Sequence, residues 1–203
     1  TNLPYFHPNL SKKAPNMEHD RGGDTDPPPL SNDDPLSGAE QRTMGIRLVN
    51  QGKLEHAIPC LEQAIRLGHD DYVSQLNLAL AYLRVGRLAE ATTLLIASLQ
   101  QYPHDADIAI LLGKALLASG QPREAIAILA PAALAHPHRF HLHYYLGLAH
   151  ARRDHSSKAI AAWCKAVRIR PNHQELKRWL KNTLQEEPHA PWPQTRLTIA
   201  KHH

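Results

Sequence analysis

The chain has 203 residues, of which 42% are hydrophobic, 5% aromatic and 21% charged, enough for one ordinary domain with a core of its own. Its mean hydropathy is −0.43, and no apolar run approaches the twenty or so residues of a membrane-spanning helix, so the composition argues against a spanning protein. The net charge of +4 is uneven, because residues 139–181 carry ten basic and two acidic side chains.

Residues 1–37 are predicted to form an extended N-terminal arm. They contain seven of the sixteen prolines and six acidic against three basic side chains, a composition that buries too little apolar surface to fold alone. The chain begins at Thr1 without a charged and then apolar leader. The compartment stays open, although this arm favours an exported or periplasmic protein over a cytoplasmic one.

A helical domain is predicted to begin at residue 38. Ser37 and Glu40 have the Ser-x-x-Glu spacing of a capping box, in which each side chain satisfies a free backbone N–H at the start of a helix. The sequence changes at this point from a proline-rich composition to a regular pattern of apolar residues. We therefore expect the first helix to start immediately after Ser37.

Four blocks of 34 residues follow without a gap, at 38–71, 72–105, 106–139 and 140–173. When the blocks are aligned, several columns of residues at the same position agree in size and polarity. The eighth position of the blocks is always small, and the twenty-fourth is always large and apolar. These columns read Gly45, Ala79, Gly113 and Gly147, then Leu61, Leu95, Leu129 and Trp163.

Each block is predicted to be a helical hairpin. Small residues at position 8 allow two helices to approach closely, and position 15 holds Gly52, Gly86, Gly120 and then Asp154 at the turn between them. Pro103, Pro137 and Pro171 stand where one block leads into the next, while Pro131 is predicted to interrupt and kink the second helix of the third block. A single hairpin cannot bury its apolar face, so the four are expected to stack.

These columns resemble the tetratricopeptide repeat family, and the resemblance covers residues 38–173. It implies a right-handed α-solenoid of four hairpins whose first helices line a concave, partner-binding groove. The family's favoured aromatic at position 4 is absent here. The basic and amide side chains that some members use to bind a terminal carboxylate are replaced mostly by aliphatic ones, so an apolar or helical partner segment fits better.

The groove residues implied by the resemblance occupy positions 2, 5, 9 and 12 of the blocks. Leu76, Leu80 and Leu83 are the ones at which an acid is expected to harm binding while leaving the hairpin core intact. An alternative is that the arm, the tail or a second copy covers this stripe. The candidate groove residues are Arg42, Ile46, Val49, Val73, Leu76, Leu80, Leu83, Ile110, Lys114, Leu117, His141, Tyr144 and Leu148.

The C-terminal half is predicted to present a basic face. Such a face is either a solvated surface or a second contact with an acidic protein surface, phosphate or anionic lipid. Nucleic acid is the less favoured partner, since aromatic side chains are sparse among the cations. The face comprises Arg152, Arg153, Lys165, Arg168, Arg170, Lys177, Arg178 and Lys181.

Histidine is unusually frequent, with six between His136 and His155, which raises the possibility of a metal or haem site. No pair has the i, i+4 spacing that places two imidazoles on one helix face. His143 and His150 lie on the inward stripe of the first helix, where the family often places aromatic residues, so the resemblance implies packed rings with one hydrogen bond each. Those at or next to the ends of blocks are expected to be polar turn residues, namely His69, His104, His136, His138 and His173. Neither a metal site nor a cofactor is assigned.

The last elements are a capping helix over 174–187 and a tail over 188–203. Leu176, Trp179, Leu180 and Leu184 form one apolar stripe that would close the end of the array. Pro188, Pro191 and Pro193 then end regular structure.

The sequence carries no motif of an enzyme. It lacks a Gly-x-Ser-x-Gly turn and a glycine-rich phosphate loop, and Cys60 and Cys164 form no Cys-x-x-Cys pair. We expect a non-enzymatic adaptor that binds protein partners and no small-molecule substrate. The alternatives are a structural subunit of a larger or self-associating assembly, held by its arm and tail, and a weaker one, a histidine-based metal or haem binder.

Overall fold

The structure is a computed structural model, and it describes residues 36–174, 176–178 and 180. The chain divides into two compact units, 1–35 and 36–203, and all described residues belong to the second. The arm before residue 36, Trp179, Leu184, Lys181 and the tail over 188–203 therefore lie outside the described residues.

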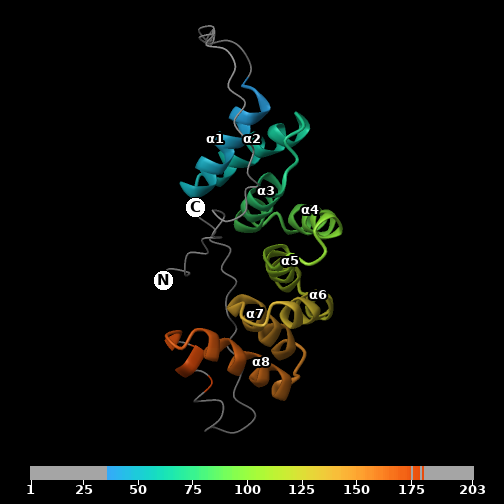
Figure 1. The fold of residues 1–203 in the computed structure, drawn as a ribbon, viewed down its shortest axis with the longest axis vertical. Coiled ribbons are helices and arrows are strands. Elements are labelled where there is room, and N and C mark those ends of the chain that lie inside the picture. Colours follow the sequence, from blue (N-terminus) through green and yellow to red (C-terminus); the bar gives the residue numbers. More distant parts are fainter. Residues whose placement is uncertain (1–35, 175, 179, 181–203) are drawn as a thin grey trace, which may run out of the picture. The chain divides into compact units, whose positions relative to one another are not determined.

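The described ranges form eight continuous helices and no strand, which confirms the all-α solenoid (Figure 1). Helices α1, α3, α5 and α7 begin at the first residues of the four 34-residue blocks. None of the described helices has the length and apolar character needed to cross a membrane. The bounds are Gly38–Asn50 for α1, Leu54–Arg66 for α2, Tyr72–Val85 for α3, Leu88–Gln101 for α4, Ala106–Ala118 for α5, Pro122–Ala135 for α6, Phe140–Ala151 for α7 and Ser156–Ile169 for α8.

The ends of the helices follow from local chemistry. Ser37 and Glu40 form the predicted capping box, and Asp71 and Asp105 cap α3 and α5 by accepting hydrogen bonds from backbone N–H groups. At position 15 of every block the backbone is left-handed, including Asp154 with φ 55° in the fourth. Glycine adopts this conformation readily and aspartate tolerates it, which explains why these two types occupy the column.

The predicted interruption at Pro131 does not occur. Helix α6 continues through Pro131 to Ala135, and α2 likewise contains Pro59. Both prolines are exposed, so water can bond the carbonyl group that loses its N–H partner. The bend expected at Pro131 stays a prediction.

The two helices of a hairpin touch at the glycine column. A Cβ atom added at Gly45 would lie 2.6 Å from Leu61 Cγ, and one at Gly113 would lie 2.6 Å from Leu129 Cγ. At Gly147 the same atom would meet the indole of Trp163 at 2.5 Å. Each large side chain of position 24 therefore occupies the space that the missing side chain of position 8 leaves.

The core runs without a break from Val49 to Leu180. Each helix packs on its neighbours in the chain, so every hairpin buries its apolar face against the next one. After α8, residues 174, 176–178 and 180 are helical, and Leu176 and Leu180 are each only 6% exposed. These described residues of the predicted capping helix thus extend the core beyond the fourth hairpin.

Candidate partner-binding face

The odd-numbered helices lie on the inner side of the array. Helix α1 contacts α3, α3 contacts α5 and α5 contacts α7, whereas in the described part no even-numbered helix contacts another. Helices on the inside of a bend are closer together than those on the outside. Figure 1 accordingly shows α4 and α6 to the right of α3, α5 and α7. We call the accessible side of α1, α3, α5 and α7 the inner face.

Burial divides the predicted groove residues into two groups. Leu76 and Leu83 are each 5% exposed and belong to the core, so an acid at either would damage folding, contrary to expectation. The other buried members are Val49, Ile110, Leu117 and Leu148. The partly exposed members are Arg42, Ile46, Val73, Leu80, Lys114, His141 and Tyr144.

The stripe of accessible side chains on the odd-numbered helices is shifted around the helix axis relative to the predicted groove residues. Position 12 of the blocks is buried in all four repeats, while position 13 is partly or fully exposed in all four. Position 13 holds Asn50, Arg84, Ala118 and Arg152. Sequence reasoning missed Arg84 on this account, although the polar character of position 13 beside the uniformly apolar position 12 was a usable signal.

Two charged residues of the inner face, Arg42 and Lys114, differ in their partners. Arg42 Nε lies 2.7 Å from Asp71 Oδ2, so Arg42 joins the first repeat to the cap of α3. Lys114 has neither a hydrogen bond nor an ion pair with the described residues, and burial together with the positive charge of Arg84 lowers the pKa of its ammonium group. The inner face thus carries an unneutralised positive charge at α5.

Aromatic rings cluster at the start of α7. Phe140 stacks on Tyr144 at 5.7 Å and on His173 at 5.2 Å between ring centroids, and the guanidinium of Arg170 lies 4.9 Å from the centre of the Phe140 ring. Tyr144 is only partly buried, so this cluster gives the fourth repeat an aromatic contribution to the inner face.

The pKa of His141 is lowered from its ordinary value of 6.5 to about 4, by burial first and then by the positive charges of Arg170 and Arg139. Between these pH values the unfolded chain binds a proton that the folded chain does not, so stability falls as the pH falls. We expect the free energy of unfolding to be about 1–2 kcal/mol lower at pH 5 than at pH 7.5 on account of His141. Urea unfolding at both pH values measures this.

The His141→Gln variant is the control for that titration. It should be less sensitive to acid than the wild type by the same amount, because the substitution removes the titrating group. Equal acid sensitivity of the two would contradict the assignment of the low pKa to His141.

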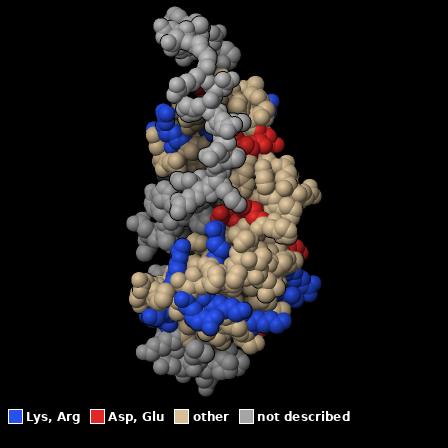
Figure 2. All heavy atoms as spheres, in the orientation of Figure 1, with Lys and Arg blue, Asp and Glu red and all other residues tan. Residues whose placement is uncertain are grey.

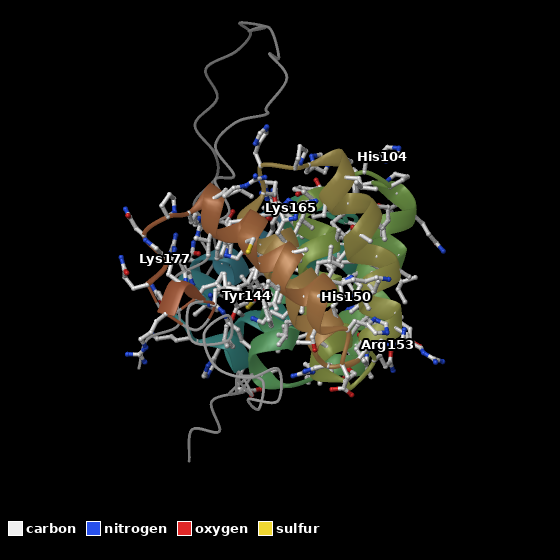
Figure 3. The ribbon with its side chains drawn as sticks, turned by 90° about the horizontal axis from the view of Figure 1, so that it is seen from below. His104, Tyr144, His150, Arg153, Lys165 and Lys177 are labelled. Atoms are coloured by element: carbon white, nitrogen blue, oxygen red, sulfur yellow. The ribbon has the colours of Figure 1, made fainter. Side chains whose placement is uncertain are left out.

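The predicted basic face is only partly available for a partner. Arg152 donates a hydrogen bond to the carbonyl oxygen of Leu117 at the end of α5, and Arg170 stacks on Phe140. Figure 2 shows Lys and Arg gathered at the lower end of the array, and Figure 3 labels Arg153, Lys165 and Lys177 around that end. The described members without such contacts are Arg153, Lys165, Arg168, Lys177 and Arg178.

The described histidines lie in several parts of the array, and the ring centroids of His150 and His155 are 5.8 Å apart. His143 is 4% exposed and its Nε2 lies 2.9 Å from the carbonyl oxygen of Pro137, as expected of a packed ring with one hydrogen bond. The buried Nδ1 atoms of His143 and His150 both lack a hydrogen-bond partner in the described part of the chain. Within the described residues no three or more His, Cys, Asp or Glu side chains are grouped as metal ligands would be.

Comparison with known proteins agrees with this architecture. Two sequence models of the tetratricopeptide repeat match residues 42–106 and 85–151. Stacked helical hairpins of this kind define a non-catalytic scaffold for protein–protein interaction. The chain belongs to the tetratricopeptide repeat family, which confirms the resemblance seen in the sequence, and it is not an enzyme.

Several solved structures are similar. MamA of AMB-1 is 27% identical with a TM-score of 0.62, and the match covers 73% of this chain and 81% of that one. MamA from Desulfovibrio magneticus RS-1 is 24% identical with a TM-score of 0.67, covering 73% and 85%. YrrB, described as a TPR protein with an unusual peptide-binding site, is 20% identical with a TM-score of 0.66, covering 71% and 75%. No curated protein matches the sequence.

Proposed function

We propose that this protein is an adaptor that holds an apolar or helical segment of a partner protein on its inner face. The observation that carries the proposal is the set of partly exposed apolar side chains on α1, α3 and α7, which we call the apolar row. Ile46 on α1, Leu80 on α3 and Tyr144 on α7 pack against the core, and Val73 on α3 is also partly exposed. A ligand that lies across the repeats would contact these side chains.

The fold makes this row suitable for one extended contact. Helices α1, α3 and α7 each supply one or two side chains, and the core fixes their spacing because α1 contacts α3 and α5 contacts both α3 and α7. A preorganised row loses little conformational entropy on binding, so modest apolar contacts along it add up to useful affinity. The printed description of YrrB as a peptide-binding repeat protein is consistent with this use of the fold.

A second contact through the basic end would add selectivity. Lys165 and Arg168 are exposed on α8, and Lys177 and Arg178 follow it. Exposed cations of this kind accelerate association with an acidic surface and weaken with salt, whereas apolar contacts on the inner face change little. We therefore assign the basic end to steering and the inner face to affinity.

The substitution Leu80→Asp is expected to lower partner capture tenfold or more, because it places a charge in the centre of the apolar row. Leu80 is partly exposed, so helical circular dichroism should be retained. The measurement is affinity capture from native extract at moderate salt, with the retained proteins identified and quantified by mass spectrometry.

The matched control is Ile96→Asp. Ile96 is 46% exposed on α4, outside the inner face, so the same change of size and charge there should leave capture unaltered. If both variants retain the same proteins in wild-type amounts, the inner face is not the binding surface. Retention mainly of further copies of this chain would instead indicate a self-associating structural subunit.

A further inference from the structure

Two cations lie on adjoining helices of the inner face, and no described residue is a counter-ion to either. Arg84 is in the last turn of α3, Lys114 is in the middle of α5, and α3 and α5 are in contact. Both side chains are partly exposed, and they occupy positions 13 and 9 of consecutive blocks, which lie on the accessible stripe. The two side chains are close enough for the charge of Arg84 to act on Lys114.

The acids near these two helices are already paired. Asp71 binds Arg42, and Asp107 binds Arg139. Asp105 accepts hydrogen bonds from the hydroxyl of Tyr72 and from the start of α5. In the described part of the chain neither Arg84 nor Lys114 has a hydrogen bond or an ion pair, so the described residues supply no neutralising group there.

The charged form of Lys114 is energetically unfavourable in the unbound protein. The Lys114 ammonium is largely desolvated and has a like charge beside it, and both effects disfavour its charged form. An anion placed between the two cations would replace the lost hydration and separate the like charges by an opposite one. A ligand that carries such an anion is therefore favoured over a purely apolar one.

The side chains next to Arg84 and Lys114 indicate which kind of ligand would carry the anion. Leu80 lies one helical turn before Arg84 on α3, so an apolar and a cationic side chain face the same ligand. A protein segment that crosses α3 and α5 meets first an aliphatic surface and then two positive charges. Charge complementarity thus calls for an acidic side chain next to an apolar one.

We propose that Arg84 and Lys114 form an anion subsite that receives the side-chain carboxylate of an internal Asp or Glu in the partner segment. This rests on the proposed function, because it specifies the chemistry of a segment bound on the inner face. The apolar row supplies the contact area, and the subsite sets the register of the segment by fixing one acidic position against α3 and α5.

The test uses a display library of random twelve-residue peptides joined through their C-termini to the carrier, so that no free terminal carboxylate is present. The library is selected on the full-length wild type and on Lys114→Glu, Lys165→Glu and Leu80→Asp. Lys165→Glu is the matched control, since it makes the same charge reversal at an exposed site on α8. Circular dichroism verifies that all four proteins are folded.

The wild type and Lys165→Glu should recover peptides with Asp or Glu at a fixed distance from apolar residues. The Lys114→Glu variant should recover Lys or Arg at that position. For a recovered peptide, changing its acid to the amide should weaken binding to the wild type about tenfold, and this difference should vanish on Lys114→Glu.

Two failures are distinguishable. Recovery of apolar peptides that need Leu80 but show no acidic preference, or no change of preference on Lys114→Glu, would overturn the subsite and leave the adaptor function standing. If no recovered peptide distinguishes the wild type from Leu80→Asp, both the anion subsite and the adaptor function are overturned.

Discussion

Replacing Gly113 with valine is expected to lower the free energy of unfolding by about 3 kcal/mol. A Cβ atom at this position would lie 2.6 Å from both Cγ and Cδ2 of Leu129, and Leu129 is fully buried. Neither α5 nor α6 can move away without opening the core between the second and fourth hairpins. Urea unfolding followed by circular dichroism gives the difference from the wild type.

Two further variants separate overpacking from helix propensity. Ala118→Val introduces the same β-branched side chain near the end of α5 at a partly exposed position, and it should cost well under 1 kcal/mol. Combining Gly113→Val with Leu129→Ala frees space for the new methyl groups, so the double variant should be more stable than the sum of the single effects predicts. Strict additivity would show that the two side chains do not compete for space.

Replacing Asp105 with alanine is expected to cost about 2–3 kcal/mol. The carboxylate accepts hydrogen bonds of 2.9 Å from the backbone N–H groups of Asp107 and Ile108, which caps α5. It also accepts a 3.0 Å hydrogen bond from the hydroxyl of Tyr72, at the start of α3. The substitution therefore removes a cap and leaves a half-buried hydroxyl without its acceptor.

A double-mutant cycle divides this loss into its two parts. Tyr72→Phe removes only the link between α3 and the N-cap residue of α5, while Asp105→Asn keeps an acceptor for the cap. We expect a coupling energy of about 1 kcal/mol between Tyr72 and Asp105 in urea unfolding. If Tyr72→Phe costs as much in the Asp105→Ala background as in the wild type, the hydroxyl and the carboxylate do not act together.

The sequence was sufficient to predict the frame of the fold. Three features of the sequence depend on contacts within a single hairpin: the period of 34 residues, the small residue at position 8 and the turn residue at position 15. Because four hairpins have the same local structure, each feature recurs four times in the sequence. Even the odd member of the turn column, Asp154, adopts the same left-handed backbone as the glycines. Ser37 marked the start of α1 because a capping box is formed by residues three apart.

The candidate face was predicted less completely, because it depends on contacts between repeats. Arg42 and Arg152 looked available in the sequence, yet Arg42 pairs with Asp71 and Arg152 donates to the carbonyl of Leu117. Such partners lie about one repeat away, and the angle between successive hairpins decides whether two side chains meet. The same angle turned the stripe so that Leu83 became buried and Arg84 accessible.

The polar bonds between repeats have a mechanical consequence. Among the polar bonds of the described residues, three join an odd-numbered helix to the N-cap residue of the next odd-numbered helix: Arg42 to Asp71, Tyr72 to Asp105, and Asp107 to Arg139. In a stack of hairpins, bonds of this kind set the rotation between one hairpin and the next. Small rotations at these three bonds add along the array, so side chains that never touch a ligand determine the length of the segment that fits along the inner face.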